Sequence, residues 1–234
     1  MADAARHNAT ATILFVVAHP NCEEFEIDFG WDDWESTMTP AANDSTCEED
    51  AHNFMRLEQK RWQDLIEIPM KDAYKKLPEK MAQAYHWVLN NIPNTKWVGK
   101  ADDDAYVRVK NLERYLHKHN PEIPMVIGEI VHESIVQQDG KWAEPDYQYE
   151  FYPDWPRGSS GYVLSRPAVQ CIVENSELLH RYQGEDTNVG IWLDEAQQNG
   201  HLKDIAYVGS SFGYEGFSLC KNSSFLIIGH NLSP

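Results

Sequence analysis

A continuous apolar run near the start of the chain limits the fold most strongly. Residues 13–18 read ILFVVA and are rich in β-branched side chains. A strand that is buried on both faces of a parallel sheet has this unbroken pattern and this length. The run therefore predicts a central strand of an α/β sheet.

The segments that follow alternate between strand and helix. Apolar residues recur at helical spacing over residues 78–91, with Pro78 in the first turn and Pro93 beyond the end. Strands are expected at residues 64–68, 96–100, 125–131 and 161–164, and helices at 109–119, 167–173 and from 185 to 200. Ser165 is expected to cap the helix that begins near residue 167. This alternation is typical of an α/β fold with a mostly parallel central sheet flanked by helices.

The length of 234 residues allows a single domain with a substantial core. Within it, residues 21–50 are acidic and polar and contain Pro, Asn and Gly. Such a composition buries little apolar surface. We therefore expect one domain over residues 1–234 that contains an acidic loop or insertion at 21–50.

The charge balance excludes some partners. The chain carries 20 basic and 37 acidic side chains, for a formal net charge of −17. Such a surface repels nucleic acid and anionic membranes. If the chain binds a nucleotide diphosphate, a bridging divalent cation is expected instead of an arginine cluster.

Cysteines and glycosylation acceptors bear on the compartment. The four cysteines have no CxxC or CxxH spacing, so they predict no zinc site, and their even number permits two disulfides. They are Cys22, Cys47, Cys171 and Cys220. Four Asn-x-Ser/Thr acceptors, at Asn8, Asn43, Asn222 and Asn231, fit a lumenal protein. The sequence as written contains no signal-peptide pattern and no run of about 18 apolar residues.

Three consecutive carboxylates mark the candidate site. Asp102, Asp103 and Asp104 directly follow the expected strand at 96–100, within KADDDAYV. Ligands of open α/β sheets bind at the carboxyl ends of strands. Adjacent carboxylates repel each other unless a cation neutralises them. The triplet fits a cation site, and it also fits an acidic turn that caps the next helix.

Four ordered blocks resemble the β-1,3-glycosyltransferase family of the secretory pathway. KADDDAYVRVKNL resembles the family's DxD region, and Leu57-Glu58 with Trp62-Gln-Asp64-Leu-Ile66 resembles its LxxExxxYxDII stretch. Tyr152-Pro with GSSGYVLS at residues 158–165 resembles YP…SGxGYVLS, and GEDTNVG at 184–190 resembles EDVxxG. The resemblance implies a GT-A fold and transfer from a UDP-sugar donor to a glycan acceptor with inversion at the anomeric carbon.

The resemblance also implies roles for individual residues. Asp186 would be the catalytic base, with Glu185 beside it. Asp104, His230 and Asp102 would hold Mn²⁺ or Mg²⁺, a cation that serves as the electrophile for the leaving diphosphate. The remaining assignments place donor-binding residues at Lys100, Asp102, Asp103 and Gly161 and acceptor-binding residues at Trp155 and Tyr162.

Simpler interpretations stay open at three of these positions. Glu185 and Asp186 could form an acidic first turn stabilised by the helix dipole. His230, within an HxxxP element, could be an ordinary surface residue instead of a manganese ligand. The aromatic residues between 142 and 155 could stack against sugar rings or could pack in the core.

Departures from the family pattern occur in the same blocks. Pro156 and Arg157 precede the SG element where relatives carry Cys or Tyr, and Ser160 stands where relatives carry glycine. Thr187 replaces the valine of the EDV block.

The sequence thus predicts a metal-dependent transferase that moves a hexose or N-acetylhexosamine, with a β-1,3 linkage implied by the resemblance. A non-catalytic relative that binds a glycan or a protein, and a glycosidase with paired carboxylates, are the alternatives. The resemblance further implies a Golgi-lumenal type II protein whose membrane anchor is absent from this sequence. We also expect the chain to lack the first strand of the family's domain.

Overall fold

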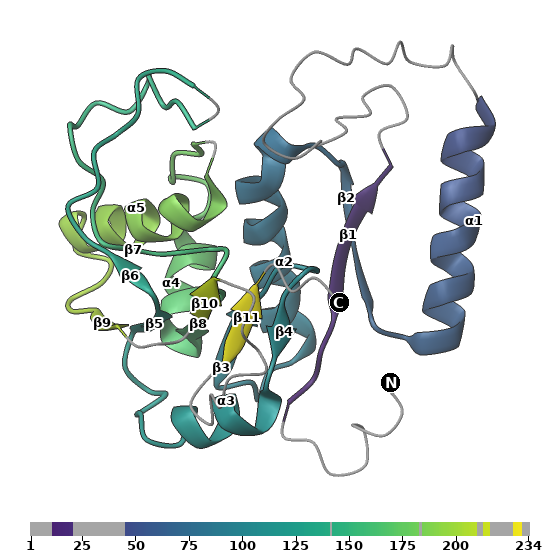
Figure 1. Cartoon of the computed structure of the whole chain (residues 1–234), viewed down its shortest axis with the longest axis horizontal. Coiled ribbons are helices and arrows are strands. Elements are labelled where there is room, and N and C mark those ends of the chain that lie inside the picture. Colours follow the sequence, from purple (N-terminus) through teal and green to yellow (C-terminus); the bar gives the residue numbers. More distant parts are fainter. Residues whose placement is uncertain are drawn as a thin grey trace. The chain divides into compact units, whose positions relative to one another are not determined.

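The computed structural model describes residues 11–20, 45–140, 142–182, 184–209, 213–215 and 227–230. The chain divides into two compact units, Met1–Lys76 and Leu77–Pro234. Figure 1 shows the elements of both units. Most of the predicted acidic loop, residues 21–44, lies outside the described residues.

The first unit contains a parallel strand pair and a helix. Strand β1 (Phe15–His19) pairs with β2 (Leu65–Lys71) in a register that runs from Phe15↔Leu65 to Ala18↔Ile68. The strands predicted at residues 13–18 and 64–68 are thus confirmed with small shifts of their ends. The expected central position of the first strand is wrong within the described residues, because β1 lies in a two-stranded sheet and Phe15 is 51% exposed. An apolar run does not specify how many neighbours a strand has. A short 3-10 helix, η2 (Tyr74–Lys76), follows β2.

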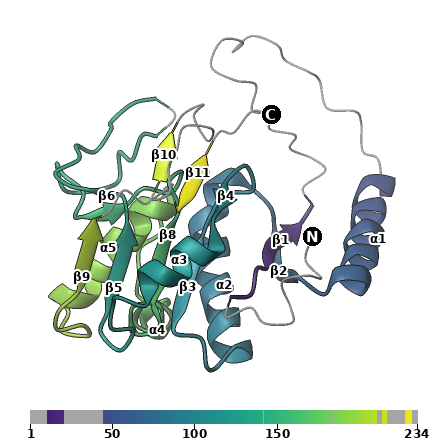
Figure 2. The same cartoon turned by 60° about the horizontal axis from the view of Figure 1, so that its bottom comes forward.

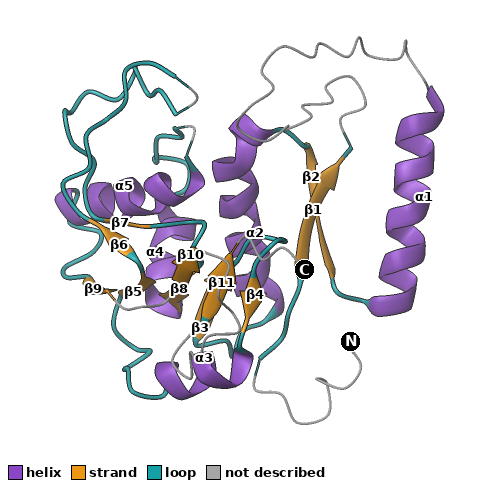
Figure 3. Ribbon diagram, in the orientation of Figure 1, coloured by secondary structure: helices purple, strands orange, loops and turns teal. Residues whose placement is uncertain are grey.

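The long helix of this unit, α1 (Ser45–Trp62), was not predicted, and residues 45–50 form its first turns instead of the end of a loop (Figure 3). Gln59 in its last turn ties the helix to β2. The Gln59 side chain accepts a hydrogen bond from the Leu65 N–H at 3.0 Å and donates one to the Leu65 carbonyl at 3.3 Å. Cys47, in the first turn, is disulfide-bonded.

The second unit is built on a mixed four-stranded sheet. Its strand order is β3 (Trp97–Lys100), β8 (Tyr162–Ser165), β5 (Met125–Gly128) and β9 (Ala206–Gly209). Strand β8 is antiparallel to both β3 and β5, whereas β5 and β9 are parallel. The expectation of a mostly parallel sheet is therefore wrong for this sheet, although the α/β class is correct.

The connection before β8 explains this difference. A parallel neighbour requires a crossover connection, which is usually a helix. Between β5 and β8 the described residues form no helix but a long loop that contains a two-stranded antiparallel sheet, β6 (Ile130–Val131) with β7 (Trp155–Pro156). Alternating strand and helix patterns in the sequence do not reveal that one strand is inserted in the opposite direction.

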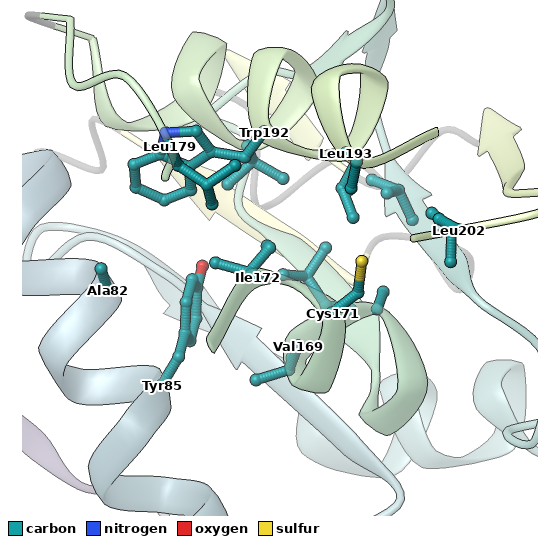
Figure 4. Close-up of a cluster of buried hydrophobic side chains, with 14 of the residues drawn as sticks. Ala82, Tyr85, Val169, Cys171, Ile172, Leu179, Trp192, Leu193 and Leu202 are labelled. Carbon is teal, nitrogen blue, oxygen red and sulfur yellow. The ribbon is translucent and has the colours of Figure 1, made fainter. Parts of the chain in front are cut away.

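The two faces of the sheet bury different side chains. Val126 and Leu164 belong to a cluster with helices α2 (Leu77–Asn91), α4 (Arg166–Asn175) and α5 (Glu185–Gln198). Figure 4 shows part of this cluster, with Trp192 and Tyr85 among its largest members. On the other face Ile127 and Val163 pack with apolar residues of α3 (Val109–Leu116) and with Ile228. Full burial of each large apolar side chain stabilises the fold by roughly 1.5–3 kcal/mol.

A second small sheet joins distant parts of the sequence. Strand β11 (Ile228–His230) is parallel to β10 (Gly213–Glu215) and antiparallel to β4 (Tyr106–Val107). Figure 2 shows β11 between β10 and β4. This pairing brings a late segment of the chain beside the segment that follows the acidic triplet.

The predicted cap at Ser165 is not observed. Its hydroxyl makes no capping hydrogen bond to α4, and it instead accepts a hydrogen bond from the Met125 N–H at 2.9 Å. Ser165 is fully buried at the end of β8, so its oxygen accepts from the neighbouring strand.

None of the helices in the described ranges combines the length and apolarity needed to cross a membrane.

Candidate functional site

The acidic triplet forms a tight turn at the end of a sheet strand. Strand β3 ends at Lys100, and the Asp102 carbonyl accepts a hydrogen bond from the Ala105 N–H at 3.1 Å before β4 begins. Asp103 and Asp104 are exposed, and Asp102 is half-buried. The predicted position of the carboxylates at a strand end is confirmed.

Lys100 joins this turn to the predicted catalytic acids. Its Nζ donates a hydrogen bond to Glu185 Oε1 at 2.8 Å and another to Asp102 Oδ1. The Lys100 and Glu185 side chains are only 15% and 13% exposed, so this ion pair is largely shielded from water. The structure thus brings together residues from β3, from the acidic turn and from the start of α5.

The charge of Lys100 is secured by its partners. Burial alone would lower the pKa of its ammonium group, but the negative charges of Glu185 and Asp102 outweigh burial and raise that pKa above its ordinary value. Lys100 therefore stays protonated. Its ammonium is committed to two carboxylates, and contact with a donor remains a prediction.

Asp186 lies at the start of α5 with two backbone donors. The Gly158 N–H donates to its Oδ2 at 2.8 Å, and the Thr187 N–H donates to its Oδ1 at 2.8 Å. Burial and then the charge of Glu185 raise the pKa of Asp186 from 3.8 to about 6, against the lowering effect of these hydrogen bonds and of Lys100. A carboxylate with a pKa in this range can accept a proton near neutral pH.

Two glycines allow close approaches in the segment between β7 and β8, Gly158 to the acids and Gly161 to Ile228. A Cβ on Gly158 would lie 2.8 Å from Glu185 Oε1 and 3.0 Å from Asp186 Oδ2. Gly161 has φ +65°, and a Cβ there would lie 2.5 Å from Ile228 Cδ1. Gly161 is therefore required by backbone geometry and packing, and its predicted donor-binding role is a separate proposal.

The predicted acceptor residues have structural partners. Tyr162 is 1% exposed, and its hydroxyl lies 3.0 Å from the Tyr85 hydroxyl, so it packs in the core and does not face a ligand. Trp155 is half-buried, donates from Nε1 to Ser134 Oγ at 2.7 Å, and packs against the cluster formed by Val136, Tyr147, Tyr152 and Ile191.

The aromatic group of this region is divided between core and surface. Tyr147 and Tyr152 are 8% exposed, whereas Trp142, Tyr149 and Phe151 are exposed. Core packing therefore accounts for the inner members. The exposed members are the ones that could stack against sugar rings, and that role stays a prediction.

His230 is described through its backbone alone. In the antiparallel pairing of β11 with β4, Gly229 lies opposite Tyr106. Continuing this register by one residue places His230 opposite Ala105, directly after Asp104. No three His, Cys, Asp or Glu side chains converge among the side chains that the structure describes. The His230 side chain does not belong to that described set.

The sequence did not predict roles for Glu129, Gly158 and Tyr85. Glu129 follows β5 directly, and the rule that ligands bind at the carboxyl ends of strands could have drawn attention to it. The role of Gly158 depends on a backbone N–H, which no residue type identifies. Tyr85 lies on a helix whose apolar pattern predicts only core packing.

A mixed α/β unit with acidic groups gathered at a strand end is typical of a ligand site in an enzyme. Comparison with known proteins identifies the family to which the chain belongs. The family model described as galactosyltransferase matches residues 43–201, which is more than half of the chain. The chain therefore belongs to the galactosyltransferase family and is a β-1,3-glycosyltransferase family member.

Individual relatives carry consistent names. UDP-GalNAc:beta-1,3-N-acetylgalactosaminyltransferase 2 of Xenopus tropicalis is 34% identical over 133 residues, which is 56% of this chain and 27% of that protein. The human protein of the same name is 31% identical over 147 residues, 62% of this chain and 29% of that protein. Beta-1,3-galactosyltransferase 5 of Mus musculus is 31% identical over 186 residues, 76% of this chain and 58% of that protein. The chain thus spans between about a quarter and three fifths of these relatives.

The Lys100 ion pairs yield a stability prediction. Lys100→Met should lower the free energy of unfolding at pH 7.5 by about 3 kcal/mol, because it leaves shielded carboxylates without their cation. Urea denaturation measures the change. Lys110→Met is the matched control, because Lys110 is an exposed residue of α3 and should change stability by less than about 0.5 kcal/mol. Equal effects of the two substitutions would show that the Lys100 network is not stabilising.

The raised pKa of Asp186 yields a pH prediction. Because the folded pKa of about 6 lies above the ordinary 3.8, the stability that Asp186 contributes is complete below pH 3.8 and is lost as pH rises through 6. After allowance for the surface that Asp186 retains, the loss is about 2 kcal/mol. Asp186→Asn should therefore stabilise the protein at pH 7.5 relative to wild type but not at pH 4. Denaturation at both pH values checks this, and an equal difference at each would contradict it.

Proposed function

We propose that the chain carries the catalytic domain of an inverting β-1,3-glycosyltransferase with a GT-A-like fold. It would move a hexose or N-acetylhexosamine from a UDP-sugar to a hydroxyl of a glycan on a glycoprotein or glycolipid. Support comes from the family match and from the names of the relatives, which refer to galactosyl and N-acetylgalactosaminyl transfer. The observation that carries the proposal is the direct bond from Lys100 to both Asp102 and Glu185, which gathers the predicted donor and catalytic residues at one edge.

Asp186 is the proposed base of this reaction. Its carboxylate takes the proton of the acceptor hydroxyl as the hydroxyl oxygen forms a bond to the anomeric carbon. The bond from that carbon to the donor diphosphate breaks, and the diphosphate leaves with the bonding electron pair. A pKa of about 6 leaves Asp186 largely ionised at neutral pH while keeping it basic enough to accept the proton.

A divalent cation, Mn²⁺ or Mg²⁺, is the proposed cofactor, and it would neutralise charge on the leaving diphosphate. Asp102, Asp104 and His230 are the proposed ligands. Carboxylate and imidazole groups suit manganese. The pairing of Gly229, the residue before His230, with Tyr106, two residues after Asp104, supports including His230. Asp103 is exposed in the same turn and remains a proposed donor contact together with Lys100 and Gly161.

The Golgi lumen is the proposed location, with a type II orientation of the full-length protein. Both follow from the family membership and not from any feature of the described helices. The disulfide at Cys47 fits an oxidising compartment. The glycosylation acceptors found in the sequence fit the same compartment.

The base assignment predicts a clear loss of transfer. Asp186→Asn should lower the rate of sugar transfer about 100- to 10,000-fold while UDP binding changes little, because the base acts on the acceptor. Transfer assays with a panel of UDP-sugars and calorimetry with UDP measure the two effects. A variant that kept more than a tenth of the wild-type rate would remove Asp186 from this role. If no donor is turned over by the wild type with or without manganese, a non-catalytic binding module becomes the better description.

The proposed metal ligands predict a shared defect. Asp104→Ala and His230→Ala should each weaken Mn²⁺ binding in the presence of UDP by about tenfold or more, because each removes one ligand. Isothermal calorimetry measures this affinity directly, without an activity assay. Asp139→Ala is the control, because it removes an equally exposed carboxylate outside the site. Unchanged affinity in His230→Ala would assign that histidine a structural role.

A further inference from the structure

The segment at residues 157–161, between β7 and β8, supplies the backbone donor of the proposed base. The Gly158 N–H binds Asp186 Oδ2 at 2.8 Å, and the Gly158 carbonyl accepts a hydrogen bond from the Gly161 N–H at 2.8 Å. Gly158 is therefore held within a turn whose position determines where its N–H points. The hydrogen bonds that fix this turn consequently also fix the geometry at Asp186.

Glu129 holds the turn on both sides of Gly158. Its Oε1 accepts a hydrogen bond from Arg157 Nε at 2.8 Å, and its Oε2 accepts one from the Ser160 hydroxyl at 2.6 Å. The Glu129 carbonyl also accepts a hydrogen bond from the Arg157 N–H at 2.8 Å. Glu129, the residue directly after β5, thus binds the turn through three hydrogen bonds.

The two side chains bound by Glu129 converge on one carboxylate. Arg157 donates to Oε1 and Ser160 donates to Oε2. Ser160 is 1% exposed, so without Glu129 its hydroxyl would lose the acceptor it has in this structure at a buried position. Arg157, Ser160 and Glu129 therefore form one connected arrangement around Gly158.

We propose that Glu129 is a positioning residue for the transfer reaction, which it serves by fixing the Gly158 N–H against Asp186. This inference rests on the proposed function, because Asp186 is the proposed base. Displacement of a catalytic group by about 1 Å can cost about 100-fold in rate. Glu129 itself has no contact with Asp186 among the described hydrogen bonds and acts through the turn.

Other groups also act on the Asp186 carboxylate. The charge of Glu185 raises its pKa, Lys100 lowers it, and the Thr187 N–H donates a second hydrogen bond. Tyr152 and Tyr162 also interact electrostatically with Asp186. A useful readout must therefore follow the Gly158 contact itself and not only the pKa of Asp186.

The amide resonance of Gly158 provides this readout. In the wild-type chain the Gly158 amide proton shift should follow the ionisation of Asp186, and Asp186→Asn should abolish that titration. In Glu129→Ala the amplitude of the titration should fall to less than half, because the turn no longer holds the N–H against the carboxylate. The rate of transfer should fall about 10- to 100-fold with little change in the donor KM.

Two further variants complete the experiment. Glu129→Gln keeps the shape of the side chain and one acceptor oxygen. It should therefore reduce the amplitude of the Gly158 titration by less than Glu129→Ala does. It replaces Glu129→Ala in the experiment if that variant does not fold. Glu122→Ala, at an exposed glutamate outside this cluster, should leave the amplitude unchanged.

The outcomes separate this inference from the proposed function. Full Gly158 amplitude in a folded Glu129 variant overturns the positioning role, whatever the rate of transfer. A reduced amplitude together with undiminished transfer by Asp186→Asn supports the hold of Glu129 on the turn and overturns Asp186 as the base.

Discussion

The shielded ammonium group of Lys100 is the interaction on which the arrangement of the site depends. Asp102 and Glu185 are acidic groups from different parts of the sequence, and without a cation between them they would repel each other. Lys100, the last residue of β3, supplies that cation and binds both. The Lys100 side chain therefore links the acidic turn to the first turn of α5.

The acid pair at the start of α5 shows how neighbouring groups acquire different properties. Glu185 is bound to an ammonium group, whereas Asp186 receives two backbone N–H groups in a poorly hydrated position. Burial and the adjacent charge raise the pKa of Asp186 in spite of those donors. A group held in this way is costly for the fold and useful for proton transfer, so its position is better explained by chemistry than by stability.

The sequence predicted most elements and the strand-end position of the acids, and its failures have identifiable physical causes. Apolar periodicity located α2 because its buried face repeats at helical spacing. The helices α4 and α5 were also expected, from signals at their ends. The pattern within β8 was also visible, but its direction was not, because strand direction depends on the path of the preceding loop. Helix α1 was missed because its residues are mostly polar. Tyr162 was misjudged because a tyrosine in a motif gives no indication that its hydroxyl is satisfied by Tyr85 inside the core.

The pairing of β11 with β4 has a consequence for the synthesis of the protein. Strand β4 and the acidic turn emerge from the ribosome early, but Ile228, which packs against Gly161 and pairs with Val107, is made only after every described helix. Contacts between residues so far apart in sequence form slowly, because a long loop must be closed first. The nascent chain therefore carries β4 without β11 while all the residues between Val107 and Ile228 are made. An unpaired strand edge can pair with another chain, so this interval is when β4 is open to association with other chains.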